Sequence, residues 1–296
     1  MIETQKQSKD PRQQHAKPPL PKQSQEHPGS SEQLEPKADY GEESYKGTNR
    51  LTDRIALITG ADSGIGRAVA LAFAREGADV LIAYLEEDED AHETERLVRE
   101  AGRKALLLPG DIRDEQHCRQ MIQCAFDDFG KLDILVNNAA YQMSQPSIEE
   151  FSSEQFDRVY RTNVFAMFYL CKAALPRMKP GSSIINTTSI QGYEPSDMLL
   201  DYASSKAAII GFTKALAKLA GKRGVRVNAV APGPVWTPLI PSTMPEEKVK
   251  EFGKGTVFGR PAQPAELAPL YVFLASQDAS YVTGEVYAAT GGHTPY

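Results

Sequence analysis

The chain has 296 residues, of which 41% are hydrophobic and 24% are charged, and its formal net charge is −6 at pH 7. A chain of this size can bury a large core without disulfides or structural metals, and it has room for one large α/β domain or two small ones. The negative charge and the absence of a basic stripe argue against a nucleic-acid partner, because nucleic-acid phosphates require clustered Lys and Arg.

The first 50 residues differ in composition from the rest of the chain. Gln, Lys, Glu, Ser and Pro dominate there, and large apolar side chains are sparse. Such a segment buries too little surface to offset its ordering entropy, which predicts a solvated tail. The alternative is an arm that lies over the folded domain or a partner subunit, anchored by Tyr40 and Tyr45. We therefore divide the chain into a polar N-terminal arm or tail, 1–50, and a folded domain, 51–296.

Three further features bear on the compartment. The residues after Met1 lack the apolar core of a signal peptide, and no apolar run approaches the roughly 20 residues of a transmembrane helix. The three cysteines have no paired spacing, which fits a reducing compartment. We expect a cytoplasmic protein with no membrane association and no metal site, in which Cys118 and Cys124 are small buried side chains.

From residue 51 onward, short apolar runs alternate with amphipathic stretches of helical period. The runs predict strands buried on both faces, at 55–59, 80–84, 105–108, 134–137, 183–187, 225–230 and 285–289. Helices are expected at 65–77, 89–101, 115–129, 155–177 and 202–221. This alternation predicts an α/β fold, a Rossmann-type doubly wound sheet of seven parallel strands in a single domain, with the first 50 residues as an extended arm or tail.

A glycine-rich turn follows the first predicted strand and leads directly into the first helix. Glycines allow a tight turn and close approach to a pyrophosphate, and the helix N-terminus offers free N–H groups and the positive end of its dipole. An ordinary glycine turn is the alternative, but the position between strand and helix favours a dinucleotide site. The expected contacts are Gly60, Asp62, Ser63, Gly64, Ile65 and Gly66.

Tyr202 and Lys206 lie one helical turn apart on the predicted helix 202–221 and share a face. A nearby ammonium, together with a positive nicotinamide ring, lowers the pKa of a tyrosine toward the working range of an acid/base catalyst. In isolation such a pair is usual on any exposed helix. Here Ser189 follows the strand at 183–187, and open parallel sheets bind ligands beyond the carboxyl ends of their strands. The Ser189 hydroxyl can therefore hydrogen-bond a substrate oxygen.

These motifs, with the spacing Gly-x-x-x-Gly-x-Gly after Thr59, resemble the short-chain dehydrogenase/reductase (SDR) family over almost all of the folded part. Further matches are Asn137-Asn138-Ala139, Asp133, Asn228 to Gly233, Gly259-Arg260-Pro261 and Val282 to Glu285; Ala140 replaces the usual glycine. The resemblance implies that Asn163, Ser189, Tyr202 and Lys206 are the catalytic residues. It also implies that Asn163 holds a water molecule, which takes part in a proton relay through Lys206.

The resemblance also implies the remaining cofactor contacts. Tyr84 stands where NAD-preferring relatives carry Asp, and Ser63 fills a position that is often basic in NADP-preferring relatives. We therefore favour NAD over NADP, although Arg67 would meet a 2′-phosphate if its helix orients it so. The other contacts are Asp111, Ile112, Asn138, Ala139, Pro232, Gly233, Val235 and Thr237, together with Tyr202 and Lys206.

The implied activity is hydride transfer between nicotinamide and a small alcohol or carbonyl compound, an aldehyde, ketone or sugar, with Tyr202 as acid/base. The candidate pocket residues are Tyr141, Gln142, Gln191, Tyr193, Trp236 and Leu239. The alternatives are a non-catalytic regulator that senses nicotinamide, an SDR-type epimerase or dehydratase, and a methyltransferase. The most similar subgroup contains bacterial members with a long polar N-terminal extension, which include general stress proteins and lie near the glucose dehydrogenases. The family further implies a homotetramer.

Overall fold

The computed structural model describes residues 9–293, and its centre is one sheet of seven parallel strands in the order β3-β2-β1-β4-β5-β6-β7. The strands are β1 (Ile55–Thr59), β2 (Asp79–Tyr84), β3 (Ala105–Pro109), β4 (Ile134–Asn137), β5 (Ser183–Thr187), β6 (Arg226–Pro232) and β7 (Val286–Ala289). Every residue of β1, β2, β4 and β5 is buried, as expected of strands covered on both faces. The predicted Rossmann-type sheet is confirmed.

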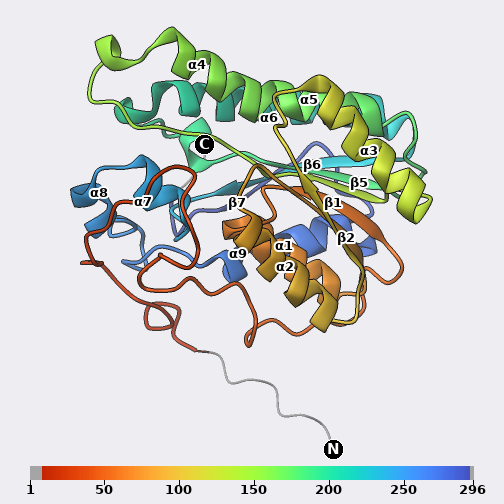
Figure 1. The fold of residues 1–296 in the computed structure, drawn as a ribbon, viewed down its shortest axis with the longest axis horizontal. Helices are drawn as coiled ribbons and strands as arrows, with labels where there is room; N and C mark the ends of the chain where they lie inside the picture. The colour runs from red at the N-terminus through yellow and green to blue at the C-terminus, as the bar shows by residue number, and fades with distance from the viewer. Residues whose placement is uncertain (1–8, 294–296) are drawn as a thin grey trace, which may run out of the picture.

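Helices cover both faces of the sheet (Figure 1). On one face lie α1 (Gly64–Arg75), α2 (Asp88–Glu100) and α9 (Pro264–Ala275), and on the other lie α3 (Glu115–Phe129), α5 (Ala166–Ala174) and α6 (Leu200–Gly221). Among the described residues, no helix is both long enough and apolar enough to cross a membrane.

Local sequence signals explain where several helices begin and end. The Asp114 side chain accepts a hydrogen bond from the Gln116 N–H and starts α3, and Gly130 ends it in the left-handed conformation, with φ of 74°. Gln263 and Glu266 form a reciprocal capping box at the start of α9, with Pro264 in the first turn.

The predicted helix 155–177 is wrong as a single element. It consists of α4 (Ser153–Tyr160), a π-helical turn (Arg161–Phe165) and α5. Three helices were not predicted: α9, and the short α7 (Leu239–Thr243) and α8 (Glu246–Lys250). The π-helical turn contains Asn163, and such turns in a helix are often found at functional sites.

Residues 9–50 contain no helix or strand, and they run along the domain as an arm (Figure 1). Leu20 and Leu34 pack in a small apolar cluster with Trp236, Ile240 and Val249. Of the two expected anchors, Tyr40 is buried within the main core cluster, and the half-buried Tyr45 hydroxyl donates to Glu76 at 2.6 Å. Of the two alternatives for this segment, the arm describes residues 9–50; the domain boundary at residue 50 stays a prediction.

Candidate active site

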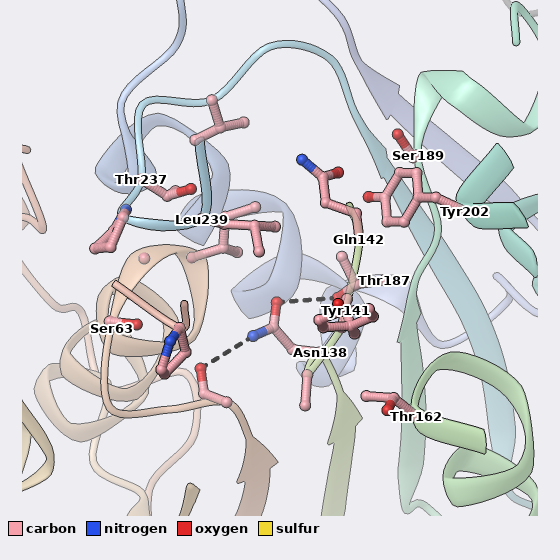
Figure 2. Close-up of a pocket in the computed structure, with 18 of the residues that line it drawn as sticks. Ser63, Asn138, Tyr141, Gln142, Thr162, Thr187, Ser189, Tyr202, Thr237 and Leu239 are labelled. Atoms are coloured by element: carbon pink, nitrogen blue, oxygen red, sulfur yellow. Dashed lines mark hydrogen bonds between the residues drawn. The ribbon is translucent and has the colours of Figure 1, made fainter. Parts of the chain in front are cut away.

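A cavity of about 330 Å³ opens at the carboxyl ends of the strands, where the strand order reverses between β1 and β4 (Figure 2). This is where open parallel sheets bind ligands, and the volume is in the range of small-molecule sites. The glycine loop after β1, the segments after β4 and β5, and the segment from Pro232 to Ile240 all contribute to its lining.

The glycine loop is packed too closely to accept side chains. Gly60 and Gly64 have φ of 60° and 53°, and a Cβ on Gly60 would lie 3.0 Å from Ala139 Cα. A Cβ on Gly66 would lie 1.8 Å from the Gly60 carbonyl oxygen, so Gly66 serves the packing of α1 on the loop and lies outside the cavity lining. The first turn of α1 carries no acidic side chain. The loop and the helix N-terminus therefore fit a diphosphate.

Asn138 and Thr59 join the strand ends that form the floor of the cavity. The Thr59 hydroxyl accepts hydrogen bonds from the backbone N–H groups of Asn138 and Ala139, both at 3.0 Å. The Asn138 amide donates to the carbonyls of Thr59 and Gly60 at 3.1 Å, and its oxygen accepts from the Thr187 hydroxyl at 3.3 Å (Figure 2). The ends of β1, β4 and β5 are thus held in one rigid unit.

Ser189, Tyr202 and Lys206 come together on one wall of this cavity. Ser189 follows β5, and Figure 2 shows its hydroxyl beside the Tyr202 phenol from α6. The Lys206 ammonium donates to the Thr187 carbonyl at 2.9 Å and lies 5.3 Å from the centre of the Tyr202 ring. Lys206 is only 1% exposed, so its side chain is buried and lies away from bulk solvent.

Burial dominates the protonation of both groups. It raises the pKa of Tyr202 to about 12, against a hydrogen bond from Ser189 that lowers it, and it lowers the pKa of Lys206 to about 7. The lowering of the tyrosine pKa by an ammonium together with a nicotinamide ring stays a prediction. In the protein alone, burial disfavours the phenolate and the ammonium alike. A further positive charge in the cavity would favour the phenolate.

Asn163 is brought near this group, and both polar atoms of its side chain have partners within the protein. Its oxygen accepts from the Tyr141 N–H at 2.8 Å, and its amide donates to the Tyr141 carbonyl and the Ser205 hydroxyl, both at 3.0 Å. Ser205 in turn donates to the Tyr202 carbonyl at 2.7 Å. The Asn163 side chain therefore joins the segment after β4 to α6. That Asn163 holds a water stays a prediction.

The other predicted cofactor contacts line the cavity as expected from the sequence. They are Gly60, Asp62, Ser63, Gly64, Ile65, Tyr84, Asp111, Ile112, Asn138, Ala139, Pro232, Gly233, Val235 and Thr237. Ala140 also lines it, in place of the family's usual glycine.

The idea that Arg67 meets a 2′-phosphate is wrong. Arg67 is 4% exposed, lies outside the cavity lining and donates to the Asp62 carbonyl at 2.8 Å and to Asp90 Oδ1 at 2.8 Å. Its guanidinium also packs against the ring of Tyr40 in the arm, 4.7 Å from the centroid. Arg67 therefore joins α1 to α2 and to the arm.

The adenine-side end of the cavity carries three carboxyl groups: Asp111, which is paired with Arg113, and Asp62 and Glu87. Burial raises the pKa of Asp62, and burial followed by the nearby Asp62 charge raises the pKa of Glu87 to about 7. Glu87 Oε1 is buried and has no hydrogen-bond partner among the described residues. Glu87 was not among the cofactor contacts predicted from the sequence.

The substrate end contains four of the six predicted pocket residues, Tyr141, Gln142, Gln191 and Leu239. The other two predictions were wrong. Tyr193 lies outside the lining, and Trp236 is 1% exposed with its indole N–H donated to the Pro36 carbonyl at 2.7 Å. Further lining residues that were not predicted include His27, Pro28, Arg158, Met244 and Phe252. Nothing in the local sequence around His27 signals a ligand site.

Comparisons with known proteins agree with this geometry. Residues 60–294 match the family model described as enoyl-(acyl carrier protein) reductase. The chain is 52% identical over 272 residues to the uncharacterized oxidoreductase YhdF of Bacillus subtilis, covering 92% of this chain and 94% of that protein. It is 49% identical over 275 residues to general stress protein 39 of the same organism, covering 93% and 96% of the two chains.

Two further similarities carry information about ligands. The glucose and ribitol dehydrogenase of Daucus carota is 44% identical over 281 residues, covering 93% of this chain and 96% of that protein. A solved structure of a short-chain dehydrogenase from Burkholderia cenocepacia in complex with NADP superposes with a TM-score of 0.77 at 31% identity, covering 82% of this chain and 99% of that chain.

Proposed function

The chain belongs to the short-chain dehydrogenase/reductase family of oxidoreductases, and from this premise we propose that it interconverts a small alcohol and its carbonyl compound with Tyr202 as acid/base. A bound nicotinamide dinucleotide would supply the hydride acceptor or donor, while the protein supplies orientation and electrostatics. The observation that carries the proposal is that Ser189, Tyr202 and Lys206 line one cavity together with the glycine loop.

The chemistry assigned to this chain is the handling of one proton. In oxidation the Tyr202 oxygen accepts the proton of the substrate hydroxyl, and in reduction it returns a proton to the carbonyl oxygen. Ser189 orients the reacting oxygen by a hydrogen bond. Lys206, held by the Thr187 carbonyl, adds a positive charge that stabilises the phenolate. Asn163 positions this group through Tyr141 and Ser205.

We further propose that NAD is the preferred cofactor. A 2′-phosphate at the adenine-side end would meet the carboxyl groups of Asp62 and Glu87. Two lining cations lie near Asp111. Arg113 is already paired with Asp111 at 2.8 Å, and the guanidinium of Arg158 packs on the ring of Tyr141, 4.0 Å from its centroid. An adenosine 2′-hydroxyl, by contrast, can donate to a carboxylate.

The proposed substrate is a small uncharged aldehyde, ketone or sugar. The substrate end combines amide side chains, Gln142 and Gln191, with apolar ones such as Leu239 and Met244. The name of the Daucus carota relative, glucose and ribitol dehydrogenase, agrees with a polyhydroxy compound. A nicotinamide-sensing regulator is disfavoured because the phenol, hydroxyl and ammonium are all present in the cavity, and an SDR-type epimerase or dehydratase because no separate substrate domain follows α6 within the described residues.

We also propose a cytoplasmic homotetramer. Exposed aromatic side chains occur on both α4 and α5: Phe156 and Phe168 are 41% and 45% exposed, and the rings of Phe156 and Tyr160 stack with their centroids 5.0 Å apart. Large exposed apolar side chains along these helices support a subunit interface there. Light scattering on the purified protein tests the assembly, and Phe168→Glu is expected to reduce its size. The three free cysteines agree with a reducing compartment.

The activity itself is tested with a panel of aldehydes, ketones, sugars and alcohols, each offered with both dinucleotides. Oxidation or reduction is followed by the absorbance of the reduced nicotinamide. We expect turnover of small polar carbonyl compounds that is lost in Tyr202→Phe and kept in Tyr193→Phe, the matched tyrosine outside the cavity. Turnover in none of the combinations would refute the proposed function.

A further inference from the structure

The N-terminal arm crosses the mouth of the cavity and supplies part of its wall. His27 and Pro28 line the same cavity as Ser189 and Tyr202, although they precede these residues by more than a hundred positions. The His27 ring meets the ring of Tyr141 edge-on, with centroids 4.9 Å apart. The Ser242 hydroxyl donates to the Pro28 carbonyl at 3.1 Å. Because Tyr141 follows β4 and Ser242 belongs to α7, this short stretch joins the two sides of the cavity.

The stretch is held in place along its length. The backbone N–H of Gln25 donates to the Pro241 carbonyl at 3.0 Å, and that of Leu20 donates to the Lys250 carbonyl at 2.8 Å. Gly29 has φ of 88°, and a Cβ there would lie 2.7 Å from the Pro238 carbonyl oxygen. The close approach of the two backbones therefore requires glycine at this position. These contacts make the arm a fixed part of the wall.

His27 presents unused hydrogen-bonding capacity to the cavity. Neither ring nitrogen has a hydrogen-bond partner among the described residues, and the side chain is only half-buried. Burial, followed by the positive charge of Arg158, lowers the pKa of His27 to about 4. The ring is therefore neutral at physiological pH and offers one donor and one acceptor, which suits an uncharged hydroxyl or carbonyl group.

The contacts of this stretch place it at the substrate end. Tyr141 is followed by Gln142, whose amide donates to the Thr243 hydroxyl of α7 at 2.9 Å. His27 and Pro28 thus contact the segment after β4 and helix α7, and residues of both line the substrate end of the cavity. Among the described residues, neither His27 nor Pro28 has a hydrogen bond or ring contact with Ser63 or Asp111, which line the cofactor end of the cavity.

We propose that His27 is a specificity-determining residue of the active site, which hydrogen-bonds a hydroxyl group of the substrate away from the reacting carbon. This inference rests on the proposed function and deepens it, since it selects small carbonyl compounds that carry an additional hydroxyl group. It also gives the arm a role in the site, because the arm contributes His27 and Pro28 to the lining of the cavity.

The test uses the full chain and two aldehydes that differ in their hydroxyl groups, glyceraldehyde and propanal. Phe at position 27 keeps an aromatic ring against Tyr141 but removes both hydrogen-bonding atoms. We expect His27→Phe to raise KM for glyceraldehyde about tenfold and KM for propanal less than about twofold, with kcat little changed. His27→Gln should recover part of the glyceraldehyde preference. The matched control is His15→Phe in the same arm, where the ring lies 4.0 Å from Glu266 and outside the cavity lining.

The single tryptophan of the chain gives a second readout that is independent of turnover. Trp236 is buried against Leu34 and donates to Pro36, so its emission reports whether the arm is docked. We expect His27→Phe to keep the wild-type emission and the wild-type dissociation constant for NAD. Equal losses for both aldehydes, weaker NAD binding, shifted emission, or the same effect in His15→Phe would overturn the inference. A wild-type protein that reduces neither aldehyde would overturn the proposed function, and the inference with it.

Discussion

The sheet and the arm reach order by different means. In the domain, whole elements are buried together: all residues of β1 and β2 lie inside, and helices cover both faces of the sheet. In the arm, residues 9–50, order depends on single side chains and on backbone bonds to the domain. Leu34 fills one apolar cluster, and Trp236 donates to the Pro36 carbonyl.

This difference separates two kinds of dependence. An arm of this composition cannot order itself, because its few apolar groups do not offset its conformational entropy. Its contacts with the domain must supply the difference. The sheet, by contrast, has its own core and needs no contact from the arm to define its strand order. Changes in the arm should therefore alter stability and the shape of the cavity while the chemistry stays in the domain.

The largest effect is expected from a comparison of two buried tyrosines, Tyr202 in the domain and Tyr40 in the arm. Tyr202→Phe removes the proposed acid/base, and we expect kcat to fall about 10³-fold or more while the dissociation constant for the dinucleotide stays nearly unchanged. Tyr40→Phe removes a hydroxyl that donates to Ser31 at 3.0 Å, and we expect full activity with a loss of about 1 kcal/mol in stability. Steady-state kinetics and urea unfolding measure both. Normal turnover in Tyr202→Phe would remove the tyrosine from its assigned role.

The second prediction concerns the apolar anchor of the arm. Leu34 is fully buried against Trp236, so Leu34→Ala should reduce the free energy of unfolding by about 3 kcal/mol and shift the tryptophan emission toward that of an exposed indole. Leu85, which is 37% exposed, is the control, and its replacement by Ala should cost less than about 1 kcal/mol. Urea unfolding followed by fluorescence measures both. An unchanged emission in Leu34→Ala would mean that the arm does not depend on this contact.

The third prediction concerns the joint between arm and domain at Glu76. This carboxylate is fully buried and accepts hydrogen bonds from the Arg50 guanidinium at 2.7 Å and from the Tyr45 hydroxyl at 2.6 Å. Burial raises the pKa of Glu76, but the hydrogen bonds from Arg50, Tyr45 and the Thr48 backbone outweigh this and lower it to about 2. Glu76→Gln should therefore lose about 2 kcal/mol of stability at neutral pH.

The pH dependence of this loss gives the control. A carboxyl group whose pKa is lower in the folded state contributes stability above its unfolded pKa of about 4.5, and this contribution disappears as the pH falls toward 2. The stability difference between wild type and Glu76→Gln should therefore shrink between about pH 5 and pH 2. A difference that is constant over this range would show that the loss comes from packing and not from the charge.

The parts that local sequence could predict are those whose physical cause is local. The spacing of the glycines predicted the loop, and the separation of one helical turn predicted that Tyr202 and Lys206 share a face. The strand pattern predicted that both would lie at the carboxyl ends of the strands, in one cavity. Helix α9 was not predicted because its own apolar residues occupy all of its faces and Pro269 lies inside it. Its sequence therefore has no amphipathic period. The π-helical turn at Asn163 was missed because the helical pattern continues through it.

The remaining errors have causes that are distant in sequence. Trp236 was predicted as a pocket residue, but its indole N–H donates to the Pro36 carbonyl of the arm and its side chain is buried there. Arg67 is withdrawn from the cavity by Asp90 of α2. His27 reaches the cavity only because its neighbours bind α7, and composition alone predicted no such contact. Contacts between the arm and the domain therefore account for the errors at Trp236 and His27.

The smallest expected effect tests the cofactor end, which the arm does not line with its own ligand groups. Glu87 is proposed to disfavour a 2′-phosphate, so Glu87→Gln should improve NADP binding about tenfold relative to NAD, with little change in kcat. Because the pKa of Glu87 is raised to about 7, its carboxyl group is mostly neutral below that pH and charged above it. The wild-type preference for NAD should therefore increase as the pH rises through 7.

In Glu87→Gln this titrating group is absent, and its contribution should disappear from the profile, which leaves the ionisation of the 2′-phosphate, with a pKa near 6, and that of Asp62, whose pKa is raised by burial. Dissociation constants for both dinucleotides, measured between about pH 6 and pH 8 by quenching of Trp236, separate the contribution of Glu87 from the other two. Glu86→Gln, beside Glu87 but exposed and outside the cavity lining, is the matched control and should leave the ratio unchanged. If the wild type binds NADP more tightly at every pH, then Glu87 does not exclude the phosphate. In that case another donor at the adenine-side end would have to bind the phosphate. Arg113 is the first candidate, and it would have to break its ion pair with Asp111 to do so.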